Sequence, residues 1–379
     1  MVAATNGAGA MNKLEHALDD VLARVDSTEA AVGPRFPIYA DPDSGEWITS
    51  RRGSWVSGFW VGQLWLRARL TRETTHLRAA REAAARSALS TRSDTVTRGL
   101  IFWYGDAAGE RLGFAPERPL PCVLSATAAG ARTGSAARTA AERLCATVDP
   151  GTGILPWGTA FGDPADEITA RVDGLAGTIP LLAWAGAPAV AERFLRGYLD
   201  IAGAPPRRGP TGACSDTATG NRLSESAPAA FVKTAGGWRA RSSPPPGWSR
   251  GRAWLLLALA DAGYWLDSAF TDYAHSSAEH APNPPVVPAA ITGATAVDTS
   301  AAAITAVALC KLGRTREAEA LISELVTEHL ARTGPRGRLL RGCYDLPGGV
   351  AVAHELIWGD YFLLLALAIV LGAVSPTLI

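Results

Sequence analysis

Apolar residues recur with helical spacing in twelve segments of the chain. Between 315 and 332, for example, Ala318, Leu321 and Leu325 follow the i, i+3, i+7 spacing of one helix face. Runs of alternating β-branched residues are almost absent and alanine is abundant, so the pattern predicts an all-α protein. The predicted helices lie near 12–25, 57–71, 75–90, 97–104, 136–147, 173–187, 189–202, 251–267, 268–278, 299–313, 315–332 and 359–374.

The connecting segments are rich in proline and glycine, and they separate helices rather than divide the chain in half. We therefore expect a single domain over 1–379, with residues 1–11 as a flexible N-terminal extension. About twelve helices of roughly 10–18 residues fit an (α/α)6 barrel, a six-hairpin toroid with six inner and six outer helices around a funnel. A superhelical repeat array is the alternative, but the chain has no fixed sequence period of the kind that arrays show.

The last apolar stretch, Phe362–Val374, is 13 residues long, whereas a membrane span needs about 20. It predicts a helix that is buried on all sides. The 36 basic residues balance 36 acidic ones, so no net field favours nucleic acid or an anionic membrane. Arginine is much commoner than lysine, which together with the alanine content suggests a GC-rich bacterial genome.

The compartment is predicted from the N-terminus and the cysteines. The first residues lack a basic region followed by an apolar one, so no secretory signal is predicted. The five cysteines form no CxxC pair, and their odd number argues against a disulfide framework. Both observations favour a reducing cytoplasm.

Three stretches carry candidate chemistry, and each has a purely structural alternative. In Gly53–Leu66, Trp55 is followed by Phe59 and Trp60 at i+4 and i+5, with Gly58 and Gly62 among them. Flat indoles beside small residues could stack on sugar rings, but they could equally pack a core. The glycines suggest either a helix start or a close approach of two backbones.

Asp173 precedes an almost wholly apolar run. It could be an N-cap or first-turn residue of the predicted helix 173–187. It could instead be a carboxyl group at the mouth of a dry cavity, where burial would raise its pKa and let it deliver and retrieve a proton.

Arg250 and Trp254 are four residues apart, so they share one face of a helix. An arginine beside indoles can bind an anionic sugar, with a fork for the carboxylate and a platform for the ring. The alternative is an arginine stacked on tryptophan for structure alone. Metal-binding, nucleophile-elbow and nucleotide-binding motifs are missing, so we expect no metal and no cofactor.

Taken together, six blocks resemble the unsaturated glucuronyl hydrolases and the related unsaturated rhamnogalacturonyl hydrolases. The blocks appear in the family's order: "SWVSGFWVGQLWL", "RVDGLAGTIPLLAWA", "DTATGNRL", "GWSRGRAW", "VDTSAAAITAVALCKL" and "GCYDLPGGVAVAHELIWGDYFLLLAL". They cover the chain from about residue 45 to 370. "VDGL" is closer to the rhamnogalacturonyl members.

The resemblance implies an (α/α)6 barrel and a metal-free reaction in which water adds across the C4–C5 double bond of a terminal unsaturated uronic acid. It places the general acid/base at Asp173 and substrate-binding residues at Trp55, Arg250 and Trp254. The family usually has a second aspartate, and alignment on Gly99 puts Thr97 at that position. Asp94 lies three residues before Thr97.

The leading hypothesis is therefore a hydrolase of unsaturated uronyl oligosaccharides, whose partner is a small oligosaccharide with an anionic sugar. A second hypothesis is a divergent relative that keeps the barrel and binds a carbohydrate or other polar ligand with lost or altered catalysis. A third is a helical toroid from another superfamily, such as a terpenoid cyclase-like or protein-binding toroid.

Overall fold

A computed structural model describes residues 2–114, 135–203, 227–279, 289 and 296–379. Its helices agree closely with the predicted segments in number and place. Within the described residues they are α1 (Val2–Val32), α2 (Ser57–Thr71), α3 (Thr74–Ser87), α4 (Arg98–Phe102), α5 (Ala108–Arg111), α6 (Ala136–Cys145), α7 (Thr178–Trp184), α8 (Pro188–Ile201), α9 (Ser249–Trp265), α10 (Ala269–Glu279), α11 (Thr299–Lys311), α12 (Thr315–Glu324) and α13 (Ile357–Val370). A π turn, Trp103–Ala107, joins α4 to α5, and another follows α12.

Six helices form a closed inner ring in the part of the chain that the structure describes. α2, α4, α7, α9, α11 and α13 contact one another in that order, and α13 contacts α2 to complete the ring. Nearly every residue of these helices is buried, including all of Ile357–Ala368 in α13. The predicted buried helix is confirmed for Phe362–Ala368, whereas the helix ends at Val370 and Gly372 and Ala373 are exposed. None of the described helices has both the length and the apolar character of a membrane span.

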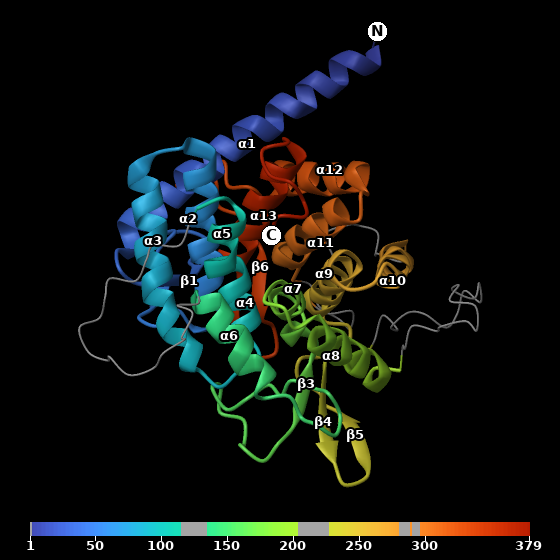
Figure 1. The fold of residues 1–379 in the computed structure, drawn as a ribbon. Coiled ribbons are helices and arrows are strands. Elements are labelled where there is room, and N and C mark those ends of the chain that lie inside the picture. Colours follow the sequence, from blue (N-terminus) through green and yellow to red (C-terminus); the bar gives the residue numbers. More distant parts are fainter. Residues whose placement is uncertain (1, 115–134, 204–226, 280–288, 290–295) are drawn as a thin grey trace.

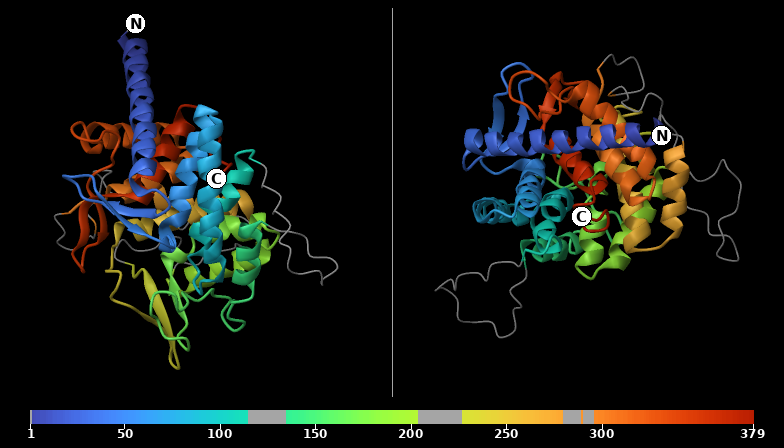
Figure 2. Two further views of the ribbon diagram at one scale, coloured as in Figure 1. Left: turned by 90° about the vertical axis from the view of Figure 1, so that its left-hand side faces the viewer. Right: turned by 90° about the horizontal axis from the view of Figure 1, so that it is seen from above.

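The other long helices pack against the outside of this ring. α3, α6, α8, α10 and α12 each contact an inner helix, and α1 lies across α13 and α2. Figure 1 and the view from above in Figure 2 show the helices gathered around a centre, with the start of α1 projecting from the body. The predicted (α/α)6 barrel is confirmed. α1 extends well beyond the predicted 12–25 and includes most of 1–11, whose flexibility stays a prediction.

The glycines of α2 permit close contact between inner helices. A Cβ on Gly58 would lie 2.4 Å from the carbonyl oxygen of Ile101 on α4. A Cβ on Gly62 would lie 2.5 Å from the ring of Tyr361 on α13. Of the two explanations for these glycines, close approach of the backbones therefore holds, and the helix begins at Ser57 just before them.

Short strands that the sequence pattern did not predict lie in the connecting segments. One sheet has the order β2-β1-β7-β6 and the other has the order β3-β4-β5, with antiparallel neighbours in both. Among the described residues the strands are β1 (Phe36–Ala40), β2 (Trp47–Ser50), β3 (Thr169–Arg171), β4 (Ala230–Thr234), β5 (Gly237–Ala240), β6 (Gly342–Asp345) and β7 (Val350–Leu356). Most are too short to show a clear alternation, so the all-α prediction holds for the barrel but missed these sheets.

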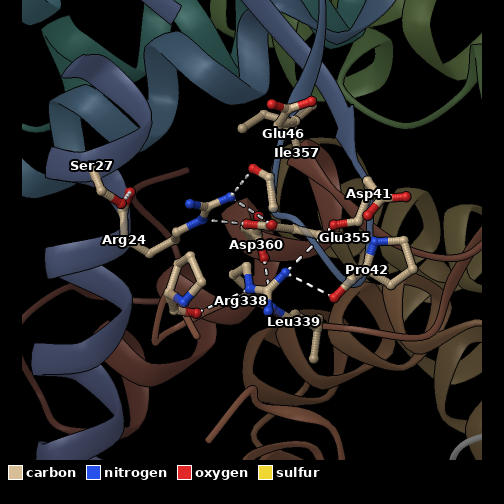
Figure 3. Close-up of polar contacts among 12 residues, drawn as sticks. Arg24, Ser27, Asp41, Pro42, Glu46, Arg338, Leu339, Glu355, Ile357 and Asp360 are labelled. Carbon is tan, nitrogen blue, oxygen red and sulfur yellow. Dashed lines mark hydrogen bonds and ion pairs between the residues drawn. The ribbon is translucent and has the colours of Figure 1, made fainter. Parts of the chain in front are cut away.

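A buried charge cluster joins α1 to the last strand and the last helix (Figure 3). Arg24 donates from Nε and Nη2 to the two carboxylate oxygens of Glu355, both at 2.7 Å. Glu355 is hydrogen-bonded to Asp360, whose Oδ1 accepts the backbone N–H of Leu339 at 3.0 Å. Nearby, Arg338 donates to the carbonyl oxygens of the 41–42 turn and of residue 335. The cluster thus connects segments that are distant in the sequence.

Burial raises the pKa of Asp360 well above its usual range, and the adjacent charge of Glu355 raises it further. Burial also raises the pKa of Glu355, while hydrogen bonding and charge from Arg24 offset part of that shift. The structure therefore favours a proton shared within this pair at pH values where free carboxyl groups are ionised.

We expect Asp360→Asn to flatten the dependence of stability on pH. A carboxyl whose pKa is raised on folding contributes stability that is complete below the unfolded value, 3.8, and is lost as pH rises through the folded pKa. Asparagine needs no proton, so its stability should not fall in this way. Thermal unfolding from pH 4 to 9 should therefore show the melting temperature of the variant rising relative to that of the wild type as pH rises. Asp43→Asn, at an exposed carboxyl, is the control. Parallel curves for Asp360→Asn and the wild type would contradict the expectation.

Candidate functional site

A cavity of about 460 Å³ opens where the two sheets meet the barrel. Its walls come from the turn before α2, the start of α4, the segment after β3, the start of α9 and the β6–β7 turn. All five predicted site residues line it: Trp55, Thr97, Asp173, Arg250 and Trp254. Residues up to 199 positions apart in sequence, Trp55 and Trp254, are therefore brought together in one cavity, as the resemblance implies.

Asp173 lies in a single 3-10 turn, Val172–Gly174, directly after β3. The predicted helix 173–187 instead begins at Thr178, so Asp173 is neither its N-cap nor in its first turn. Gly177 lies between the turn and the helix and has a φ of 70°. Residues with a side chain rarely adopt this backbone conformation, so glycine suits the position. Asp173 is therefore not a cap of that helix but a residue of the preceding 3-10 turn, and it lines the cavity. Its role as the acid/base stays a prediction.

Arg171 holds the Asp173 carboxylate in a two-point contact. Its Nε donates to Oδ1 at 3.0 Å and its Nη2 donates to Oδ2 at 2.8 Å. The guanidinium also lies over the ring of Trp157 at 4.1 Å. Burial lowers the pKa of Arg171, but the charge and hydrogen bonds of Asp173 outweigh it, so the pKa is raised overall. This two-point pairing fixes the orientation of the carboxyl group.

Thr97 lies immediately before α4 and is almost completely buried. Its hydroxyl is 3.0 Å from that of Thr95. Asp94 does not substitute for an acid at this position, because its Oδ2 accepts from the backbone and side chain of Thr159 at 3.0 and 2.9 Å. Among the described lining residues, the carboxyl groups are those of Asp173 and Asp345. Asp345 is exposed at the end of β6 and accepts the N–H of Gly348 at 3.2 Å.

The aromatic residues of the opening cluster separate by function. Phe59 and Trp60 are fully buried in the core, whereas Trp55 is half-buried at the cavity wall. The indole N–H of Trp55 donates to the hydroxyl of Tyr344 at 3.2 Å, which fixes its ring. Trp254 contributes to the cavity but is 1% exposed and stacks on Phe59 at 6.1 Å, so it also belongs to the core.

Arg250 is held mainly by the protein. Its Nη1 donates to Asp298 at 2.6 Å and also to the carbonyl of Cys343, and its Nη2 donates to the carbonyl of Tyr344 at 2.8 Å. The guanidinium also lies over the rings of Trp248 and Trp358. Most of the N–H groups of Arg250 that were expected to bind a ligand thus hydrogen-bond to the protein instead, mainly to the strand that carries Tyr344.

The sequence argument missed Arg171, Trp157 and Tyr344. The only signal for Arg171 was its closeness in sequence to Asp173, because Asp173 lies in a 3-10 turn beyond β3 and the spacing rule for a strand does not apply to the pair. Tyr344 and Trp157 are far from the predicted residues in sequence and had no comparable signal. The block "DTATGNRL" (216–223) lies outside the described residues.

No family model matches the chain, and no curated protein matches it in sequence. Solved structures of unsaturated glucuronyl hydrolases do match it. The enzyme from Bacillus sp. GL1 is 24% identical, with 94% of this chain and 96% of that chain covered and a TM-score of 0.72. A heparin-specific enzyme is 17% identical over 94% and 96%, with a TM-score of 0.74.

A third match is the enzyme from Streptococcus agalactiae, which is 18% identical over 94% of this chain and 91% of that one, with a TM-score of 0.72. At these identities the matches establish the fold. The resemblance seen in the sequence is therefore confirmed for the barrel, over nearly the whole length of both chains.

Proposed function

We propose that the protein is a hydrolase that acts on unsaturated uronyl oligosaccharides by hydrating the C4–C5 double bond. The observation that carries the proposal is the Asp173 carboxyl group in a cavity bordered by the indole of Trp55 and by two arginines. Among the matched structures, one is described with dGlcA-Glc-Rha-Glc and another as complexed with dGlcA-GalNAc6S. The small anionic oligosaccharide expected from the sequence is consistent with these ligands.

In the proposed reaction, Asp173 in its protonated form gives a proton to C4 of the sugar. The carboxylate that results then takes a proton from the water molecule that attacks C5. The product at C5 is a hemiketal, which opens to a ketone, and the glycosidic bond at C1 then breaks to release the leaving sugar. One carboxyl group thus returns to its starting state.

The cavity walls have distinct proposed tasks. Trp55 offers an indole face to the sugar ring and is fixed by Tyr344. Trp254 and Thr97 shape the cavity wall, and Arg250 holds the Tyr344 strand in place beside the ligand. Orientation of the substrate by such fixed groups lowers the barrier to reaction.

The test is turnover of unsaturated disaccharides produced by polysaccharide lyases. Hydration removes the conjugated double bond, so the ultraviolet absorbance of the unsaturated uronate should fall when enzyme is added. Disaccharides with glucuronyl and with rhamnogalacturonyl linkages should be compared. A folded protein that turns over none of them would exclude the proposal.

The second candidate is a divergent barrel that binds a carbohydrate or other polar ligand with lost or altered catalysis. The observation that favours it is Thr97, a neutral residue that lines the cavity where the resemblance places a second aspartate. We expect Thr97→Asp to raise turnover by about 10²-fold or more if only that acid is missing.

Thr97→Asn is the matched control, because asparagine has the shape of aspartate but carries no acidic group. An equal rate for Thr97→Asp and Thr97→Asn would show that this one substitution does not explain a loss of catalysis. Thermal unfolding of each variant separates a change in rate from a loss of folded protein.

A further inference from the structure

The arginines that line the cavity differ in the donors that they leave for a ligand. Arg250 is 3% exposed, and both of its terminal nitrogens donate hydrogen bonds within the protein, to Asp298 and to two backbone carbonyls. Arg171 is 23% exposed and uses Nε and Nη2 for Asp173. Within the described residues, Nη1 of Arg171 has no hydrogen-bond partner and is not enclosed. The outer edge of Arg171, Nη1 and Nη2, therefore remains for an anion.

The orientation of that edge is fixed before a ligand arrives. Asp173 holds the inner edge of the guanidinium at 2.8 and 3.0 Å, and the ring of Trp157 lies against its plane at 4.1 Å. A guanidinium held on two sides loses little freedom when a carboxylate binds its third. Planar two-point binding of a carboxylate is the geometry for which arginine is best suited.

We propose that Arg171 binds the carboxylate of the anionic sugar and shares its guanidinium between that group and Asp173. This inference rests on the proposed function and names the group that would recognise its substrate. It also gives the ion pair a task in the reaction. A ligand carboxylate on Arg171 brings a second negative charge beside Asp173, and a like charge favours the protonated form of a carboxyl. Binding of the anionic sugar thus promotes proton uptake by the group that must donate a proton.

The experiment compares two ligands that cannot react. One is a saturated glucuronyl disaccharide, which has no double bond to hydrate, and the other has the same linkage with the carboxylate reduced to a hydroxymethyl group. Calorimetry gives the dissociation constant of each. We expect the wild type to prefer the carboxylate by about 10- to 100-fold, the range for a hydrogen bond to a charged group. In Arg171→Met the preference should fall to within about 2-fold of unity.

Two further variants keep the result decisive. Arg241→Met is the control, because Arg241 pairs with Asp163 and Glu167 and is absent from the cavity lining among the described residues. It should keep the full preference. Asp173→Asn retains Arg171 and serves as the comparison for proton uptake. Measurements in two buffers of different ionisation enthalpy should show proton uptake with the carboxylate ligand in the wild type and none in Asp173→Asn.

The outcomes separate this inference from the proposed function. An unchanged preference in Arg171→Met, or a wild type that binds the two ligands equally or binds neither, overturns the role of Arg171. The absence of proton uptake overturns the sharing with Asp173. A wild type that prefers the carboxylate through Arg171 but turns over no unsaturated sugar supports the inference and excludes the hydrolase.

Discussion

Replacement of Asp173 by asparagine is expected to lower kcat on an unsaturated uronyl disaccharide by about 10²- to 10⁴-fold. Asparagine has the shape of aspartate and can still accept from Arg171, but it cannot give or take the proton that hydration requires. The effect should therefore appear in kcat, with a smaller change in KM. Initial rates at saturating and limiting substrate, followed by ultraviolet absorbance, measure both constants.

Asp345→Asn is the matched control for this experiment. Asp345 is the other carboxyl among the described residues that line the cavity, and it is exposed at the end of β6, where it accepts the N–H of Gly348. Its amide variant should change kcat only a few-fold, on the scale of an exposed hydrogen bond. A large loss in Asp345→Asn together with a small loss in Asp173→Asn would transfer the acid/base role to Asp345.

The helices could be predicted because they depend on local pattern, and the residues that line the cavity could be predicted because the resemblance placed their sequence blocks in one site. The helices of the inner and outer rings show helical spacing of apolar residues, because each helix buries one face or all of its faces in the barrel. Trp55, Thr97 and Asp173 lie close to the starts of inner helices. In this barrel the segments before those helices border the same cavity. Residues that were identified from separate sequence blocks therefore line one cavity.

The pairing of the charged groups could not be predicted, because it depends on contacts between distant segments. The carboxylate of Asp94 accepts hydrogen bonds from Thr159, 65 residues away. The guanidinium of Arg250 donates to Asp298 and to a backbone carbonyl of β6. The role expected for Arg250 assumed free donors. The strands that carry Arg171 and Tyr344 are four residues or shorter, so they showed no alternation from which their orientation could be inferred.

The second large effect is expected for stability, in Arg24→Met. Arg24 is 6% exposed and Glu355 is 0% exposed, so removal of the arginine leaves a buried carboxyl without its cation. Breaking a buried pair on one side costs about 3–5 kcal/mol, because the remaining charge keeps its desolvation cost and loses its partner. The same substitution releases the contact of α1 with the carbonyl of Gly45. Urea unfolding followed by tryptophan fluorescence should show the loss as a lower midpoint.

The double variant Arg24→Met/Glu355→Gln shows whether the unpaired charge is the cause. It removes the carboxylate as well, so it should recover a substantial part of the stability that Arg24→Met loses. Glu317→Gln is the surface control: Glu317 is 54% exposed in its pair with Arg314, and its loss should cost less than about 1 kcal/mol. A double variant as unstable as Arg24→Met would show that packing of the arginine side chain, rather than compensation of Glu355, holds α1 to the barrel.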